Sequence, residues 1–148
     1  MRCSPAPTPN ELDRLGTVNI TIKNQPFVLW VADELDEREH GLMQVTHEQM
    51  TPLRDGTERG MLFVFPYEDF LSFWMKDTII PLDIAYVSAA GVVVGTYTMA
   101  PLDVRYNQYP SKAPARYAIE VNAGVWARLG LQASDRIEIP DSVLNRPR

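Results

Sequence analysis

Short stretches of alternating apolar and polar residues run along most of the chain and predict β-strands. In residues 17–23 every second side chain is apolar, which is the period of a strand with one buried face. Residues 27–32 form a second apolar run after a turn at 24–26, so the two runs predict a β-hairpin. Further strands are expected at residues 60–65, 70–75, 80–87, 92–99, 116–121 and 136–139.

Helical signals are short and few. Asp33 precedes an acidic stretch that ends at Gly41, and these are typical residues for a helix start and a helix stop. Thr46–Gln49 has the spacing of a capping box, and Asn122 precedes an apolar helical face that ends at Gly130. Because strands and helices do not alternate regularly, the sequence predicts a mostly β fold, namely an antiparallel β-sandwich or barrel-like domain with two or three short helices.

The chain is expected to form a single domain, since 148 residues is the size of one hydrophobic core. Three prolines within five positions near the start predict a flexible tether over residues 1–16. The β domain is placed at residues 17–140, and residues 141–148 are expected to be a loose tail. Residues 99–114, with three further prolines, predict a long surface loop.

The balance of charge argues against polyanionic partners. The chain has 14 Lys and Arg against 19 Asp and Glu, a net charge of -5, and no run of basic residues. It therefore lacks the electrostatic footprint of a nucleic-acid-binding protein. No apolar run approaches the ~20 residues that span a bilayer, so we expect neither nucleic acid as a partner nor a transmembrane segment.

The start of the chain bears on cellular location. Cys3 is the only cysteine and is followed by Ser, Pro, Ala and Thr, so an internal disulfide is excluded. One interpretation is a bacterial lipoprotein whose signal peptide has been removed, with a lipid anchor at Cys3. The other is a free thiol in a flexible terminus. The first predicts an exported protein of the periplasm or cell envelope, and a cytoplasmic location is the alternative.

No complete catalytic or cofactor motif is present in the sequence. Neither His40 nor His47 has a second His, Cys or acidic residue at ligand spacing on a recognisable zinc-binding helix or knuckle. A Gly-x-Ser-x-Gly nucleophile elbow, a Walker loop and a Gly-x-Gly-x-x-Gly turn are all missing. We therefore expect no metal site and no cofactor.

Two acidic residues, Asp83 and Glu120, interrupt otherwise apolar strands. A carboxylate in such surroundings must be exposed, paired or hydrogen-bonded, because burying a bare charge is costly. If the two side chains meet, they form a carboxylate pair with split pKa values, as in hydrolases or lyases that act on sugars or peptides. The commoner alternative is that each fixes a loop or an arginine such as Arg59 or Arg116.

The segment from Phe73 to Thr78 is a second candidate for ligand contact. Strand alternation places Trp74 and Lys76 on one face, where Trp74 either edges a groove or belongs to the core. Asp77 and Thr78 follow directly. They either face the same groove or close a turn with their own backbone.

A third candidate is the loop that contains Tyr106 and Tyr109. It combines aromatic and amide side chains outside any periodic segment, and such residues suit carbohydrate or peptide contact through stacking and hydrogen bonds. An ordinary surface loop is the alternative explanation.

Five motifs occur in a fixed order along the chain, namely Gly41-Leu42-Met43, Gly60 to Phe65, Phe73 to Thr78, Pro81 to Ile84 and Tyr117 to Gly124. Their order and spacing resemble a known family, the uncharacterised bacterial and archaeal proteins called domain of unknown function 192. The resemblance runs from Val18 to Ile139. It implies a compact β-sandwich with a few short helices, export signals in many members and no established activity. The family tends to place arginines on either side of Gly-Leu-Met, where this chain has His40 and Val45, so an anion-binding role for those arginines is in doubt here.

Three functional hypotheses follow. The first is a non-catalytic binding or accessory domain of the cell envelope, whose ligand is a small molecule, a glycan or a peptide. Its site is expected near Trp74, Asp77, Thr78, Asp83 and the loop from Tyr106 to Tyr109. The second is a hydrolase or lyase that uses Asp83 and Glu120 as acid and base, which predicts both carboxyl groups around one cleft. The third is a purely structural envelope protein, which predicts an exposed apolar patch and no pocket.

Overall fold

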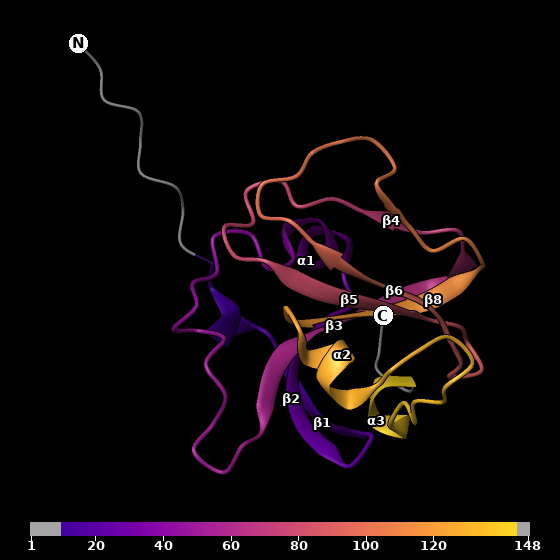
Figure 1. Cartoon of the computed structure of the whole chain (residues 1–148), viewed down its shortest axis with the longest axis horizontal. Coiled ribbons are helices and arrows are strands. Elements are labelled where there is room, and N and C mark those ends of the chain that lie inside the picture. Colours follow the sequence, from indigo (N-terminus) through magenta and orange to yellow (C-terminus); the bar gives the residue numbers. More distant parts are fainter. Residues whose placement is uncertain (1–9, 145–148) are drawn as a thin grey trace.

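The protein is mostly β, as the sequence predicts (Figure 1). The computed structural model describes residues 10–144. A short 3-10 turn, η1 (Leu12–Arg14), precedes the first strand. The strands are β1 (Thr17–Ile22), β2 (Gln25–Ala32), β3 (Glu58–Asp69), β4 (Ser72–Phe73), β5 (Leu82–Val87), β6 (Val93–Met99), β7 (Tyr109–Pro110) and β8 (Ala115–Asn122). The helices are α1 (Leu35–His40), α2 (Val125–Leu129) and α3 (Asp141–Leu144).

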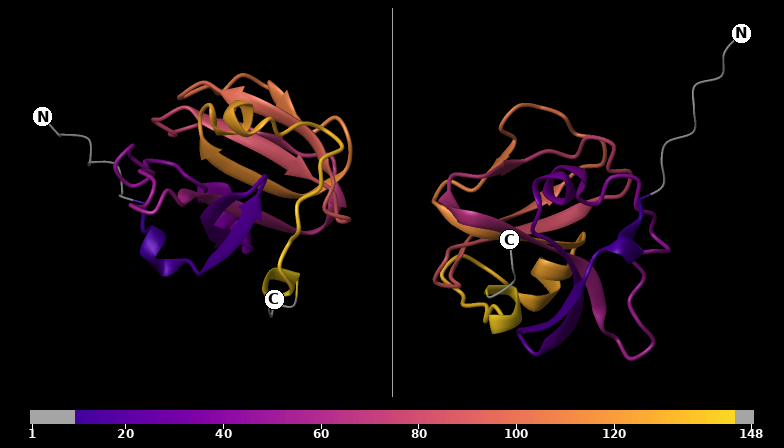
Figure 2. Two further views of the ribbon diagram at one scale, coloured as in Figure 1. Left: turned by 60° about the horizontal axis from the view of Figure 1, so that its bottom comes forward. Right: turned by 180° about the vertical axis from the view of Figure 1, so that it is seen from behind.

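Six strands form one mixed sheet in the order β1-β2-β3-β8-β5-β6, and β4 pairs with β7 in a small second sheet. The expected antiparallel pairing occurs throughout the large sheet except between β2 and β3, which are parallel. A parallel pair cannot be joined by a tight turn, and here the crossover consists of α1 and residues 41–57. The sheet is strongly twisted and does not close into a barrel (Figure 2).

Local turn chemistry explains both hairpins of the large sheet. Between β1 and β2 the turn falls at Lys23 and Asn24, both with positive φ, the geometry that favours a two-residue hairpin. It therefore lies slightly before the turn expected at 24–26. Between β5 and β6, Gly91 has φ +82°, as predicted for that position.

Two expected strands differ from the sequence interpretation. The strand expected at 70–75 is reduced to the two residues of β4. Residues 136–139 form no strand, since only Arg136 bridges to Val92. In both shortened strands a loop residue accepts a backbone hydrogen bond instead, since Met75 donates to Asp103 and Ile137 donates to Gly91. The segment Thr46–Gln49, by contrast, forms both hydrogen bonds of the expected capping box at the start of a hydrogen-bonded turn.

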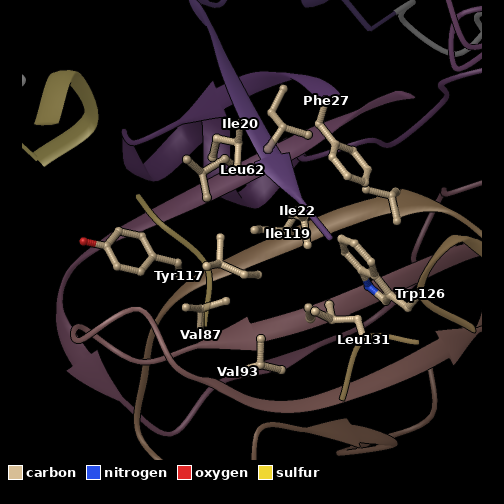
Figure 3. Packing of buried hydrophobic residues seen from close by; sticks show 14 of the residues in the cluster. Ile20, Ile22, Phe27, Leu62, Val87, Val93, Tyr117, Ile119, Trp126 and Leu131 are labelled. Carbon is tan, nitrogen blue, oxygen red and sulfur yellow. The ribbon is translucent and has the colours of Figure 1, made fainter. Parts of the chain in front are cut away.

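Two hydrophobic cores cover the two faces of the sheet. Figure 3 shows the first, in which side chains of β1 and β2 meet those of β8 and the aromatic ring of Trp126 in α2. The second core lies on the opposite face and contains Leu42, Met61, Met75 and Tyr86. In Figure 1, α1 lies above the central strands and α2 lies below them. On each face of the sheet, the hydrophobic core is therefore closed by loops and short helices.

Both ends of the described chain pack on the domain. Leu12, within the expected tether, is buried. At the other end, residues 141–144 were expected to begin a loose tail, but they form α3 and bury Val143 in the first core. The remaining residues of the tether and tail, 1–9 and 145–148, lie outside the described part. No helix within residues 10–144 is long and apolar enough to cross a bilayer.

Candidate functional site

A groove of about 220 Å³ lies beside helix α1, on the face of the sheet that carries the second core. We call it the aromatic groove. One wall comes from α1 and the following turn, namely Leu35, Arg38, Glu39, His40, Gly41 and Met43. The other wall comes from β3, β4 and the residue after it, namely Phe63, Phe65, Ser72, Phe73 and Trp74. The groove therefore lies between two segments that are separate in the sequence, residues 35–43 and residues 63–74.

The aromatic wall is built by edge-to-face stacking. Phe63 and Phe65 project from the same side of β3, because side chains alternate along a strand. The ring of Phe73 meets that of Phe63 at a centroid distance of 4.8 Å, and that of Phe65 at 6.2 Å. On its other side Phe73 contacts Tyr86 at 5.8 Å. Because such pairs have preferred geometry, the wall has its shape before any ligand arrives.

The opposite wall, helix α1, is fixed at both ends. A capping box closes its N-terminus. The helix ends at Gly41, whose φ is +52°, and a Cβ there would lie 3.2 Å from the ring of Phe63. The side-chain amide of Asn10 donates hydrogen bonds of 2.9 and 2.8 Å to two carbonyls of the following turn. These contacts hold the end of α1 and the turn that follows it close to Phe63.

Arg38 provides a positive charge within the groove lining. Its Nη1 donates to the carbonyl oxygens of Asp33 and Val64, at 2.6 and 3.1 Å. Its guanidinium lies 5.2 Å from the centroid of the Phe65 ring, within the range of a cation–π contact. No carboxylate among residues 10–144 forms an ion pair with Arg38. The side chain is half-buried, so its charge is partly removed from water and lacks a counterion in this part of the chain.

Of the candidates Trp74, Lys76, Asp77 and Thr78, only Trp74 lines the groove. Its ring is half-exposed, and the ammonium of Lys76 lies 5.5 Å from its centroid. Asp77 has φ +55°, and its carbonyl accepts the N–H of Gln44 at 2.9 Å. Thr78 is buried and its hydroxyl donates to the carbonyl of Lys76. Asp77 and Thr78 therefore shape the turn that carries Trp74.

The two tyrosines of the long loop have different surroundings. Tyr109 is buried, and its hydroxyl donates to Asp103 at 2.6 Å and accepts the N–H of Ala100 at 3.1 Å. Hydrogen bonds from Arg105 and Tyr109 hold the pKa of the Asp103 carboxyl well below its usual range. Tyr106 is 97% exposed. Tyr109 therefore anchors the loop, and neither tyrosine lines the aromatic groove.

Asp83 is buried and fixes helix α2. Its carboxylate accepts hydrogen bonds from the hydroxyl of Thr98 at 2.7 Å and from the backbone N–H groups of Gly124 and Trp126, each at 3.0 Å. A carboxylate at this position supplies partners for the free N–H groups of a helix N-terminus. The cap of α2 is therefore this distant side chain and not Asn122, the residue that the sequence suggests.

Glu120 is buried on the other face of the sheet. The register pairs it with Ile84 and pairs Asp83 with Val121. Since directly paired residues share a face and neighbours alternate, the carboxyl groups of Asp83 and Glu120 project from opposite faces. Burial raises the pKa of the Glu120 carboxyl from 4.5 to about 8. The structure therefore does not bring the two acids together around one cleft.

Neither acid forms an ion pair with the arginines that the sequence suggested. The guanidinium of Arg59 lies 6.0 Å from the ring centroid of Trp30. Arg116 donates through Nε to the carbonyl of Phe65 at 3.1 Å. Within residues 10–144, no group of three or more His, Cys, Asp or Glu side chains is placed to hold a metal ion.

Sequence reasoning missed the α1 side of the groove. Leu35 and Arg38 are three positions apart, a spacing that places two side chains on one helix face. Leu35 is the only apolar residue of α1 and is 64% exposed. A single leucine in a charged six-residue segment could have indicated a contact surface. The local sequence did not show which other part of the chain would lie beside it.

The arrangement is suited to binding. It combines preformed apolar walls, a cation without a counterion among the described residues, and a half-exposed tryptophan at the edge. Such pockets are typical of ligand sites, in which apolar surface gives affinity and a few polar groups fix orientation.

Comparisons with known proteins agree with the fold. A crystal structure of a protein described as a candidate transcription regulator from Sinorhizobium meliloti 1021 matches with a TM-score of 0.70 and 29% identity, over 82% of this chain and 91% of that one. A crystal structure of a protein of unknown function from Novosphingobium aromaticivorans DSM 12444 matches with a TM-score of 0.69 and 30% identity, over 92% and 94% of the two chains. No curated protein matches the chain.

The family model DUF192, described as Uncharacterized ACR, matches residues 18–139. The match covers most of the chain and spans both walls of the aromatic groove. This protein therefore belongs to the DUF192 family.

Proposed function

We propose that this protein is a non-catalytic binding domain and that the aromatic groove holds part of a peptide ligand. The observation that carries the proposal is the groove itself, with stacked phenylalanine rings on one wall and a fixed helix on the other. Apolar surface that is prearranged and open to solvent favours association, because the walls need no ordering when the ligand binds.

The size of the groove favours one side chain over a whole small molecule. Sites that enclose drug-sized ligands measure about 300–1,000 Å³, and this groove measures about 220 Å³. It accommodates one large apolar group while the rest of the ligand lies outside. A peptide with a single large apolar residue meets that requirement, and its backbone would run past Leu35 and Trp74, the two exposed apolar residues of the lining.

A glycan fits the lining less well. Sugar rings stack on aromatic faces but also need several hydrogen-bonding partners for their hydroxyl groups. Most of the lining side chains here are apolar, and one face of Trp74 is within reach of the Lys76 ammonium. We therefore favour the peptide and treat glycan binding as an outcome of the test.

Other functional classes receive less support. The hydrolase or lyase hypothesis needs Asp83 and Glu120 around one cleft, and they project from opposite faces. The likeness to a candidate transcription regulator does not lead us to propose DNA binding, because the net charge is -5 and nonspecific DNA affinity depends on positive charge. Export and a lipid anchor at Cys3 stay predictions from the sequence, and Cys3 lies outside the described residues.

The proposal is tested by titrating 15N-labelled full-length protein with N-acetyl amides of the twenty amino acids and, separately, with cellobiose and chitobiose. We expect amide shifts around the groove with the large apolar members. Leu35→Ser and Trp74→Ser should weaken this binding. Tyr67→Ser is the matched control, since Tyr67 is 67% exposed and does not line the groove.

Two results would count against the proposal. Shifts produced by the disaccharides alone would replace the peptide with a glycan. An equal loss of binding in Tyr67→Ser and Leu35→Ser would show that the groove is not the site.

A further inference from the structure

We infer that the aromatic groove recognises a carboxylate joined to a large apolar group, and that Arg38 binds the carboxylate. This inference rests on the proposed function and names the chemistry of its ligand. The carboxylate comes either from the C-terminus of a peptide or from an acidic side chain next to the apolar residue. Both sources present the same two oxygens to a guanidinium.

The geometry of Arg38 leaves one edge of its guanidinium available. Nη1 is engaged by the carbonyls of Asp33 and Val64. Nε and Nη2 form no hydrogen bond within the described residues. These two nitrogens form the edge that binds carboxylates through two parallel hydrogen bonds. The two carbonyl contacts hold the group in place, so little side-chain entropy remains to be lost on binding.

The surroundings of Arg38 also favour an anion with an apolar body. Its guanidinium lies against the ring of Phe65, a contact that leaves the edge of the group accessible while covering one face. Lys76 adds a second cation, beside the lining residue Trp74. Glu39 also lines the groove and opposes an anion, but it is exposed, and solvent screens exposed charges strongly.

A purely structural role would also use Arg38, because its two carbonyl contacts join the start of α1 to β3. That role is fulfilled by Nη1 alone and does not depend on the chemistry of any ligand. The two roles are separated by asking whether the protein distinguishes an acid from its amide, and whether that distinction disappears when Arg38 is changed.

The experiment compares four probes by NMR titration of the full-length chain: N-acetylphenylalanine, N-acetylphenylalaninamide, and the amides of N-acetyl-Asp-Phe and N-acetyl-Asn-Phe. For the wild type we expect an acid to bind about tenfold to a hundredfold more tightly than its matched amide, as for a hydrogen bond to a charged group. If the first pair shows the difference, the source is a C-terminus. If the second pair shows it, the source is an acidic side chain.

The same titrations on Arg38→Met should remove the preference for the acid while the amides still bind. Arg38→Lys keeps the charge without the paired donors and should retain part of the preference, and it remains informative if Arg38→Met fails to fold. Arg54→Met, a change of an exposed arginine, should behave as the wild type.

The outcomes separate the two levels of the argument. Equal binding of acids and amides by the wild type, or an unchanged preference in both Arg38 variants, overturns the carboxylate inference while the groove remains a binding site. If none of the probes shifts groove resonances in any variant, the proposed function fails together with the inference.

Discussion

The buried carboxyl group of Glu120 offers a quantitative test of the structure. Burial raises its pKa from 4.5 to about 8, so the folded protein keeps this proton over a pH range in which the unfolded chain has released it. Folding therefore binds a proton, and the free energy of unfolding contributed by this site falls as the pH rises from 4.5 to 8. Below 4.5 both states are protonated and no penalty remains.

The size of the effect follows from the shift. Each pH unit within that window costs about 1.4 kcal/mol. At pH 7 the site is expected to lower the free energy of unfolding by about 3 kcal/mol, and above pH 8 the loss levels off at about 5 kcal/mol. Glu120→Gln keeps the shape of the protonated acid and removes the titration. The variant should match the wild type at pH 4 and exceed it by about 3 kcal/mol at pH 7.

Urea denaturation of both proteins from pH 4 to pH 8, followed by tryptophan fluorescence, measures this difference directly. Taking the difference between variants cancels every other titrating group. Glu138→Gln, at an exposed position, is the control and should show no such pH dependence. A stability difference that stays constant across the pH range would refute the reasoning, since it would mean that Glu120 has the same pKa in the folded and unfolded states.

Two further predictions concern the backbone around the two faces. Asp83→Ala should lower the free energy of unfolding by about 3 kcal/mol, because three donors lose their acceptor. It should also speed hydrogen exchange of the Trp126 amide. Unchanged exchange of that amide would contradict the role of Asp83 as the cap of α2. Gly41→Ala should lower the free energy of unfolding, measured by thermal denaturation, by about 2 kcal/mol. The residue at this position has positive φ, and a Cβ there would lie 3.2 Å from the ring of Phe63. Gly56→Ala, with positive φ and open space, should cost less, and equal costs would argue against the contact.

Much of the sheet could be predicted because strands with one buried face alternate visibly in the sequence. β1, with Ile20 and Ile22 buried and their neighbours exposed, is the clearest example. The parallel pairing of β2 and β3 could not be predicted, because strand periodicity carries no information on direction. Only the length of the crossover distinguishes a parallel neighbour from an antiparallel one, and many loops have that length.

The two buried acids could be recognised from the sequence but not interpreted. Their neighbours showed that each needs a special environment. For Asp83 the partners are the hydroxyl of Thr98 and two backbone N–H groups about forty residues later, and no local pattern reveals them. For Glu120 the opposite-face placement depends on the β5–β8 register, and a one-residue difference in register exchanges the faces of a strand.

The groove was the least predictable feature. Trp74 was a candidate from its strand position, but its partners Leu35 and Arg38 belong to a helix more than thirty residues earlier. Such a surface arises only when the chain folds, because it depends on where the crossover places α1 relative to β3. The tyrosine loop, by contrast, was attractive for its composition, and the structure uses Tyr109 to anchor the loop.

The central claim is that a large apolar side chain occupies the aromatic groove, and isotope-filtered NOE spectroscopy tests it most directly. With unlabelled N-acetylphenylalanine bound to 13C-labelled protein, we expect contacts between the ligand ring and the methyl groups of Leu35 and Met43, which both line the groove. Contacts confined to the exposed side chains of Leu102 and Val104 would contradict the claim and place the ligand on the long loop.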